Sequence, residues 1–171
     1  TAGVDISGLG IGAEQAFLPG GATITGGAGN DVLIGGNGDD TINTGGGNNT
    51  VHISRGIDHI NLGFNTGTDV LLFSADMFAA PVDSPDIVTN FSTLDTIDLD
   101  ALVASITLGG NFNSQSAGLA SLSTSHSVAF FRTDTHVLFV DVNHDGAIDV
   151  AHDMSVKLEG VTSLSSWNII A

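Results

Sequence analysis

A nine-residue repeat near the start of the chain constrains the fold more than any other feature of the sequence. Residues 26–34 read Gly-Gly-Ala-Gly-Asn-Asp-Val-Leu-Ile, and residues 35–43 read Gly-Gly-Asn-Gly-Asp-Asp-Thr-Ile-Asn. Both segments fit the pattern G-G-x-G-x-D-x-U-x, in which U is a large apolar residue. A unit this short holds one turn and one short strand, so it buries its apolar side only by stacking on neighbouring copies.

Weaker copies of the repeat flank these two segments. Copies that keep only part of the pattern lie at residues 17–25, 44–52 and 53–61. In these copies the position of the aspartate holds Ala22, Asn49 and Asp58. After a slip of two residues, the frame resumes at Gly67, Asp69 and Leu71. The repeat therefore extends over several units in phase, which a single glycine-rich turn would not do.

The position of the apolar residue predicts which side chains face the interior. Glycines let the turns adopt left-handed backbone conformations and let carbonyl oxygens approach an ion closely. The eighth residue of each copy lies in a strand, where successive side chains point to opposite faces. We therefore expect an interior lined by Ile24, Leu33, Ile42, Val51 and Ile60.

The charge of the chain excludes several classes of partner. The sequence has 19 acidic and 3 basic residues, which gives a net charge of -16. Such a chain repels nucleic acids and anionic membrane surfaces, and it has no apolar run of the roughly 18 residues that a membrane helix needs. We expect no nucleic-acid binding and no membrane insertion. The natural counter-charge is a divalent cation, and oxygen-rich turns suit calcium.

The sequence contains none of the common catalytic motifs. It has no H-E-x-x-H, no G-x-S-x-G, and no lysine after its glycine-rich turns, which argues against a metalloprotease, a serine hydrolase and a phosphate-binding loop. The chain also lacks cysteine, so disulfides and cysteine-based zinc sites are excluded. We expect that this chain is not an enzyme, and the activity of a longer parent protein stays open.

The chain resembles the RTX (repeats-in-toxin) family, and the likeness extends beyond the repeats. Residues 86–102 are similar to the segment D-x-I-x-D-F…D-x-I-D-L-x-x-L that follows the repeats in serralysin-type metalloproteases, and they depart from it at Asn90. Residues 136–161 are similar to the closing strands of that module and of RTX surface-layer and adhesin proteins. Residues 167–171 are similar to its hydrophobic tail, with Asn168 in place of aspartate.

The resemblance implies an all-β fold, in which a short parallel β-roll continues into an antiparallel, β-sandwich-like carboxy-terminal cap. We expect a capping or linker segment at residues 1–16, a calcium-binding roll at 17–72, and a β-rich cap with a carboxy-terminal secretion signal at 73–171. Within the cap, the apolar runs 127–132 and 136–142 predict a hairpin.

The resemblance also implies where calcium binds. In this family two repeats complete one coil, so turns 18 residues apart are stacked, which pairs Asp40 with Asp58 and Asp31 with Asn49 and leaves Ala22 beside Asp40 at a degraded end. Carboxylates stacked ~4.8 Å apart repel each other unless a cation lies between them. We expect about two to four calcium ions in the roll. The expected ligands are Gly26, Ala28, Asp31, Gly35, Asn37, Asp40, Gly45, Gly47, Asn49, Gly56, Asp58 and Asp69.

A second candidate metal site lies near the end of the chain. Its residues stand at positions 1, 3, 5, 6 and 9 of an EF-hand-like loop: Asp141, Asn143, Asp145, Gly146 and Asp149. The twelfth position is His152 where an EF-hand has glutamate, and the flanking residues favour strands over helices. Calcium binding and a strand turn stabilised by its own Asx side chains both stay open.

These features predict a folding switch. Calcium that binds the folded roll and not the unfolded chain adds its binding energy to folding. Extracellular calcium modules have Kd values of order 10⁻⁴–10⁻³ M, so the repeats would stay unfolded in the cell and fold outside it. We expect the calcium-binding carboxy-terminal module of a bacterial protein that the type I secretion machinery delivers to the extracellular space or the cell surface.

Two other functions fit the same sequence. One is the anchoring or assembly domain of a surface-layer protein or adhesin, which would self-associate at the cell surface. The other is the non-catalytic tail of a secreted enzyme, such as a serralysin-type protease or an alginate epimerase. Calcium-dependent self-assembly would favour the first alternative, and a catalytic motif in a longer parent chain would favour the second.

Overall fold

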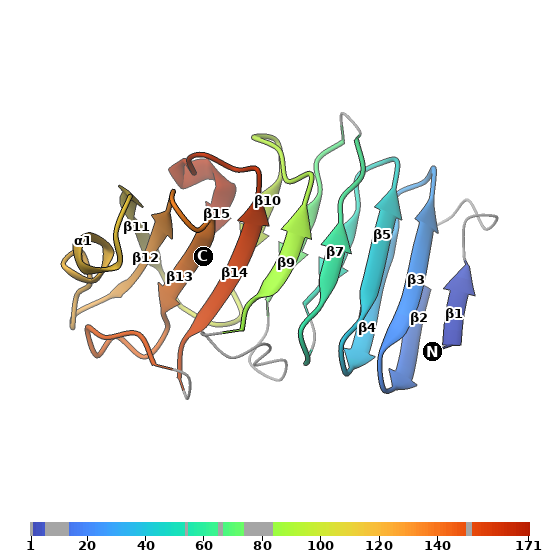
Figure 1. Ribbon diagram of the computed structural model, residues 1–171, viewed down its shortest axis with the longest axis horizontal. Helices are drawn as coiled ribbons and strands as arrows, with labels where there is room; N and C mark the ends of the chain where they lie inside the picture. The colour runs from blue at the N-terminus through green and yellow to red at the C-terminus, as the bar shows by residue number, and fades with distance from the viewer. Residues whose placement is uncertain (1, 6–13, 54, 65–66, 74–83, 150–151) are drawn as a thin grey trace.

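A computed structural model of the chain describes residues 2–5, 14–53, 55–64, 67–73, 84–149 and 152–171. Of the expected amino-terminal segment 1–16, residues 1 and 6–13 lie outside this description. The described strands form two sheets, one of nine strands and one of six, and the chain winds between them (Figure 1).

The first half of the molecule is a parallel β-roll, because the chain alternates between the two sheets and each strand pairs with the strand one coil away. The strands of the larger sheet are β1 (Ala2–Asp5), β3 (Ala22–Gly27), β5 (Thr41–Gly45), β7 (His59–Asn61) and β9 (Asp86–Thr89). The strands of the smaller sheet are β2 (Glu14–Pro19), β4 (Val32–Asn37), β6 (Thr50–His52), β8 (Val70–Leu72), β10 (Thr96–Asp98) and β15 (Ile169–Ile170).

Two files of apolar side chains fill the space between the sheets, as the repeat predicts. In the larger sheet the parallel register aligns Ile24, Ile42, Ile60 and Val88. In the smaller sheet it aligns Leu33, Val51, Leu71, Ile97 and Ile169. All these residues are buried in one continuous core, so the expected inward positions are confirmed.

The parallel ladder continues past residue 72, where the sequence suggests the end of the roll. Strand β9 pairs with β7, and β10 pairs with β8, both in parallel. These two strands therefore add a further coil, made from the segment in which the nine-residue spacing is lost.

The closing strands extend the larger sheet, edge to edge with the roll. They are β14 (Met154–Glu159), β13 (Val137–Asp141), β12 (Ser127–Arg132) and β11 (Ile106–Phe112). The expected hairpin is confirmed, because β12 and β13 pair antiparallel, and β13 and β14 do the same. At the two ends of this group the pairing is parallel, between β14 and β9 and between β11 and β12. The all-β fold, with a parallel roll running into antiparallel closing strands, is thus confirmed.

A short helix lies against β11 and β12, and a 3₁₀ turn lies against β10. Helix α1 (Gln115–Leu119) begins after Ser114, whose hydroxyl accepts a hydrogen bond from the Ala117 amide. It packs against the outer face of the sheet, where a side chain at Gly118 would overlap the ring of Phe130. The 3₁₀ turn η2 (Ser166–Asn168) leads into β15. Among the described residues, no helix has the length and apolar character of a membrane span.

A matched pair of glycines tests how closely the coils touch. Gly45 and Gly160 have similar φ angles, +84° and +83°, but a methyl group at Gly45 would overlap the Gly27 carbonyl oxygen of the next coil, while nothing lies within 4 Å of Gly160. Alanine at either position adopts a left-handed conformation, which costs about 1–2 kcal/mol. We expect Gly45→Ala to lower the free energy of unfolding by clearly more than Gly160→Ala in urea titrations with excess calcium. Equal losses would contradict direct stacking at this turn.

Candidate metal centre

The turns of the roll lie along two edges, and from β4 to β10 an acidic or amide side chain lies at the start of each strand of the roll or just before it. One edge holds the connections from the larger to the smaller sheet, and the other holds the return connections (Figure 1). Because stacked turns share the ladder's register, these side chains form one column along each edge.

The Asp40 column consists of Asp40, Asp58 and Asp86, with Ala22 at its amino-terminal end. Asp40 Oδ1 accepts a hydrogen bond from the Ala22 amide at 2.6 Å, and Asp58 Oδ1 accepts one from the Asp40 amide at 2.9 Å. Asp86 Oδ1 accepts one from the Asp58 amide at 2.8 Å. Each carboxylate thus contacts the backbone of the preceding coil, which confirms the expected stacking of Asp40 on Asp58 and of Ala22 beside Asp40.

The Asp31 column, on the opposite edge, consists of Asp31, Asn49, Asp69 and Asp95. The Asp31 amide donates to Asn49 Oδ1 at 2.9 Å, the Asn49 amide donates to Asp69 Oδ1 at 2.7 Å, and the Asp69 amide donates to Asp95 Oδ1 at 2.8 Å. Asn49 Nδ2 also donates to Asp69 Oδ1 at 2.9 Å. At the carboxy-terminal end, Asn168 Nδ2 donates to the Asp95 carbonyl at 2.9 Å and closes the column.

Both columns are buried, although most of their members are acids. The exposure of Asp58 and Asp86 is 0%, and that of Asp31, the most exposed member, is 7%. Buried anions are stable only when paired, protonated or bound to a cation. The columns therefore combine close stacking, negative charge and little water, which is the arrangement that a divalent cation stabilises.

Asp86 gives the clearest sign of a missing partner. Its Oδ2 atom is buried and has no hydrogen-bond partner. Burial, with smaller contributions from the charges of Asp58 and Asp39, raises the pKa of Asp86 to about 8, although the hydrogen bond from the Asp58 amide lowers it. A hard cation beside Oδ2 would satisfy this atom and keep the carboxyl ionised, so the residues present fit calcium.

The predicted backbone positions lie beside the columns. Gly26 and Gly45 lie at the ends of β3 and β5, Gly35 and Asn37 lie in β4, and Ala28, Gly47 and Gly56 lie in turns. The Gly27 amide donates to Asp31 Oδ2 at 2.9 Å, so the backbone next to Gly26 meets the Asp31 carboxylate. A side chain at Gly47 would overlap the Gly29 carbonyl oxygen of the adjacent coil. These glycines let the carbonyls of successive turns stack in contact.

Two members of the columns, Asp86 and Asp95, were not predicted as site residues. The hydrogen bond between Asp40 and Asp58 joins residues 18 positions apart in the sequence. The bond between Asp58 and Asp86 joins residues 28 apart, and the bond between Asp69 and Asp95 joins residues 26 apart. The nine-residue frame cannot place them, because the longer connections break it. The signal that could have found them is the alternation after each acid, Asp-Ile-Val and Asp-Thr-Ile, which repeats the strand pattern of the preceding coils.

The 141–149 segment forms the first part of the connection between β13 and β14. Gly146 N donates to Asp141 Oδ2 at 3.0 Å, and Asp145 N donates to Asn143 Oδ1 at 3.2 Å. Asp149 lies next to His152, with Oδ1 3.1 Å from Nδ1. In the part of the chain that is described, no group of three or more His, Cys, Asp or Glu side chains converges on one metal position. Sites in this chain therefore depend on backbone and amide oxygens as well as carboxylates.

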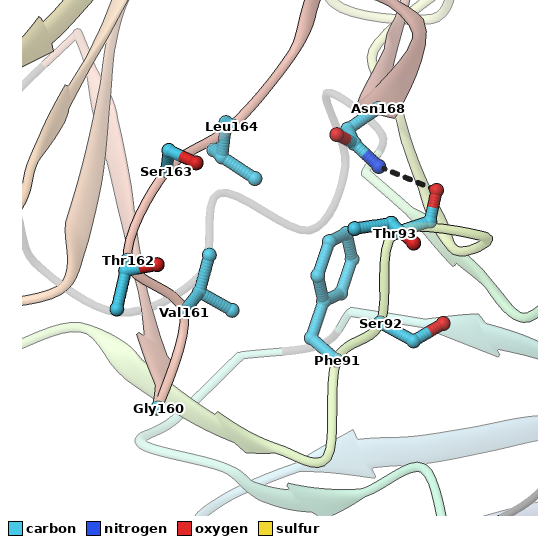
Figure 2. Close-up of a pocket in the computed structure, with 9 residues that line it drawn as sticks. All are labelled: Phe91, Ser92, Thr93, Gly160, Val161, Thr162, Ser163, Leu164 and Asn168. Carbon is cyan, nitrogen blue, oxygen red and sulfur yellow. Dashed lines mark hydrogen bonds between the residues drawn. The ribbon is translucent and has the colours of Figure 1, made fainter.

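A pocket of about 250 Å³ lies between the loop before β10 and the segment after β14 (Figure 2). Its lining includes Phe91, Thr93, Val161 and Leu164, and Asn168 Nδ2 donates to the Thr93 carbonyl at 3.4 Å. None of its lining residues is titratable. The lining therefore offers no general acid or base that could activate its serine and threonine hydroxyls.

The raised pKa of Asp86 predicts a pH dependence in calcium-free buffer. Between its usual value and about 8, the folded state retains a proton on Asp86 that the unfolded chain has lost, so the free energy of unfolding falls as pH rises. We expect circular dichroism in chelator to show more β-structure at about pH 6 than at about pH 8, because the folded calcium-free fraction falls across that window. The difference between the parent chain and Asp86→Asn isolates this carboxyl from His52, whose burial lowers its pKa and acts in the opposite direction. An unchanged pH dependence in Asp86→Asn would contradict the assignment.

Comparison with known proteins agrees with this geometry. Residues 19–51 match the RTX calcium-binding nonapeptide repeat, in four copies. Among solved structures, the chain is similar to the AlgE6R3 subunit from the Azotobacter vinelandii mannuronan C5-epimerase, with 21% identity and a TM-score of 0.50, over 88% of this chain and 78% of that one. No curated protein sequence matches the chain. The chain therefore contains a module of the RTX family: calcium-binding nonapeptide repeats folded as a β-roll.

Proposed function

We propose that this module folds when calcium enters the Asp40 and Asp31 columns, and that this folding takes place outside the cell. The observation that supports the proposal most directly is the burial of stacked carboxylates, Asp58 on Asp86, with Asp86 Oδ2 left without a partner. Without a cation, these charges oppose the stacking that the apolar core favours.

The proposed ligands combine side chains and carbonyls. Asp40, Asp58 and Asp86 serve one edge, and Asp31, Asp69 and Asp95 serve the other, where Asn49 adds a neutral oxygen. The carbonyl ligands proposed from the repeat pattern are those of Gly26, Ala28, Gly35, Asn37, Gly45, Gly47 and Gly56. Calcium accepts such mixed sets of six to eight oxygens, whereas magnesium requires a smaller, near-octahedral shell. We place the end of the calcium-dependent roll at β10 and treat residues 99–171 as its closing cap.

Linkage gives the size of the effect. A ligand present at 100 times its Kd and bound only by the folded state stabilises that state by about 2.7 kcal/mol per site. Two to four such sites contribute about 5–11 kcal/mol together, which is comparable to the ~5–15 kcal/mol that holds an ordinary domain folded. Calcium at extracellular concentration can therefore decide whether the roll folds, while cytosolic calcium leaves it unfolded.

A calcium titration followed by circular dichroism tests this switch. We expect a cooperative gain of β-structure at ~0.1–1 mM calcium, and no such gain with magnesium. Asp58→Asn keeps the shape of the side chain but removes a buried charge, and we expect it to raise the calcium midpoint roughly tenfold. Asp100→Asn, at an exposed position outside both columns, removes the same charge and is expected to leave the midpoint unchanged. Full β-structure in chelator at neutral pH would refute the proposal.

The export function rests on the carboxy-terminal tail. We propose that residues 166–171 form part of an uncleaved signal for the type I secretion machinery, since an unfolded acidic chain can pass through a narrow exporter. In the folded protein this tail contributes β15, which pairs with β10. The same segment would then serve export before folding and closure of the roll after it.

A reporter fused to the amino end of the chain tests export in a bacterium with a type I secretion system. We expect removal of residues 166–171 to abolish export, and we expect Asp58→Asn to be exported normally, because passage requires an unfolded chain. Export that persists without the tail would exclude the signal. Loss of export with Asp58→Asn would instead indicate that folding precedes passage.

A second candidate function is that of a non-catalytic module in a longer secreted enzyme, and the similarity of fold to a subunit of a mannuronan C5-epimerase favours it. A surface-layer or adhesin role predicts calcium-dependent self-association instead. Sedimentation of the folded chain separates the two roles, because an enzyme module stays monomeric in millimolar calcium while an assembly domain forms larger species.

A further inference from the structure

The connection between β13 and β14 gathers oxygen ligands outside the repeats. Residues 141–153 contain four aspartates and one asparagine but no lysine or arginine. Asp141 is the last residue of β13, and Asp153 immediately precedes β14. The two ends of the connection thus bring carboxylates to the same end of an antiparallel strand pair.

The backbone of this connection wraps around its own side chains. Gly146, with a φ of +80°, donates its amide hydrogen to Asp141 Oδ2 at 3.0 Å, and Ala147 N donates to Asp145 Oδ1 at 2.8 Å. Asn143 Nδ2 donates to Asp145 Oδ2 at 2.9 Å. These bonds hold the first, third and fifth side chains of the pattern within one loop.

Asp141 supplies the observation that points to a ligand. Its exposure is 0%, and its Oδ1 atom is buried without a hydrogen-bond partner. The carboxylate is aimed into the loop, because its other oxygen accepts from the Gly146 amide. A buried carboxylate oxygen left unpaired is costly unless a cation or a proton donor meets it.

Asp153 supplies the carboxylate that the sequence pattern lacks at its twelfth position. It is buried, with Oδ1 accepting from Val142 N at 2.8 Å and Oδ2 accepting from Asp149 N at 2.8 Å. These contacts point Asp153 back into the loop, near Asp141. Burial raises the pKa of Asp153, and the charge of Asp141 raises it further. The residue after His152 thus occupies the place of the missing acid.

The histidines of the loop have other contacts. His144 Nε2 lies 2.7 Å from the hydroxyl of Ser127, and His152 Nδ1 lies 3.1 Å from Asp149 Oδ1. The groups that face the loop are therefore carboxylate and amide oxygens, which calcium prefers over zinc.

We propose that Asp141, Asn143, Asp145 and Asp153 bind a calcium ion in the β13–β14 connection, separate from the ions of the roll. Asp141 and Asp153 provide the buried half of the shell, and the exposed Asn143 and Asp145 complete it by rotation of their side chains. Such an ion would join the end of β13 to the start of β14 and fasten the cap.

Amide resonances of the full chain test this site directly. In two-dimensional ¹H–¹⁵N spectra, we expect the Gly146 amide signal to shift on calcium titration and not on magnesium titration. Asp145→Asn removes one exposed ligand charge without disturbing the core, and we expect it to raise the calcium midpoint of Gly146 roughly tenfold. The matched control Asp100→Asn is expected to leave that midpoint unchanged.

The outcomes separate this site from the roll. A Gly146 signal that does not respond to calcium, or that responds equally in Asp145→Asn, overturns the proposal even if the circular dichroism transition of the roll is present. A Gly146 response that survives Asp58→Asn at its original midpoint supports a site independent of the columns. If the roll does not depend on calcium but Gly146 responds as expected, the loop proposal stands and the folding switch fails.

Discussion

Successive coils of the roll are joined by hydrogen bonds in which a carboxylate or amide oxygen of one coil accepts from the backbone of the preceding coil. Asp40, Asp58 and Asp86 make this contact on one edge, within 2.6–2.9 Å. The contact orients the turns, holds the strands in register and buries the acids, so it creates the charge repulsion that a cation must relieve. Turn geometry and burial in this module follow from it, and so does the calcium dependence proposed for its folding.

The apolar core and the charged columns act against each other when calcium is absent. Alternate residues of short strands form one core along the roll, from Ile24 to Ile169. A roll this narrow has a large surface for its volume, and small cores of this kind rarely hold a fold alone. The closing strands enlarge the core with Phe131, Leu138 and Val156. The closing strands therefore stabilise a roll whose repeats form only a small apolar core by themselves.

The sequence predicts local features of this fold better than pairings across long distances. Inward positions such as Leu33 and Ile42 follow from a nine-residue period in which each copy repeats the last. The stacking of Asp40 on Asp58 follows from the resemblance to the RTX family, which implies two repeats per coil. Asp86 and Asp95 escaped prediction because longer connections precede them, so spacing no longer gives register. The parallel pairing of β14 with β9 joins segments far apart in the chain, and no local pattern encodes it. In the β13–β14 connection the pattern gave Asp141 and Asp145, but the role of Asp153 depends on burial that only the folded chain provides.

Asn49 interrupts a row of acids with a neutral amide, and its Nδ2 atom donates to Asp69 across the gap between two coils. At this contact the Asn49 side chain supplies a hydrogen-bond donor to the Asp69 carboxylate, in a place where two stacked carboxylates would need an ion between them. The Asp31 column therefore carries less charge repulsion at this contact than the Asp40 column, whose members are all carboxylates apart from Ala22.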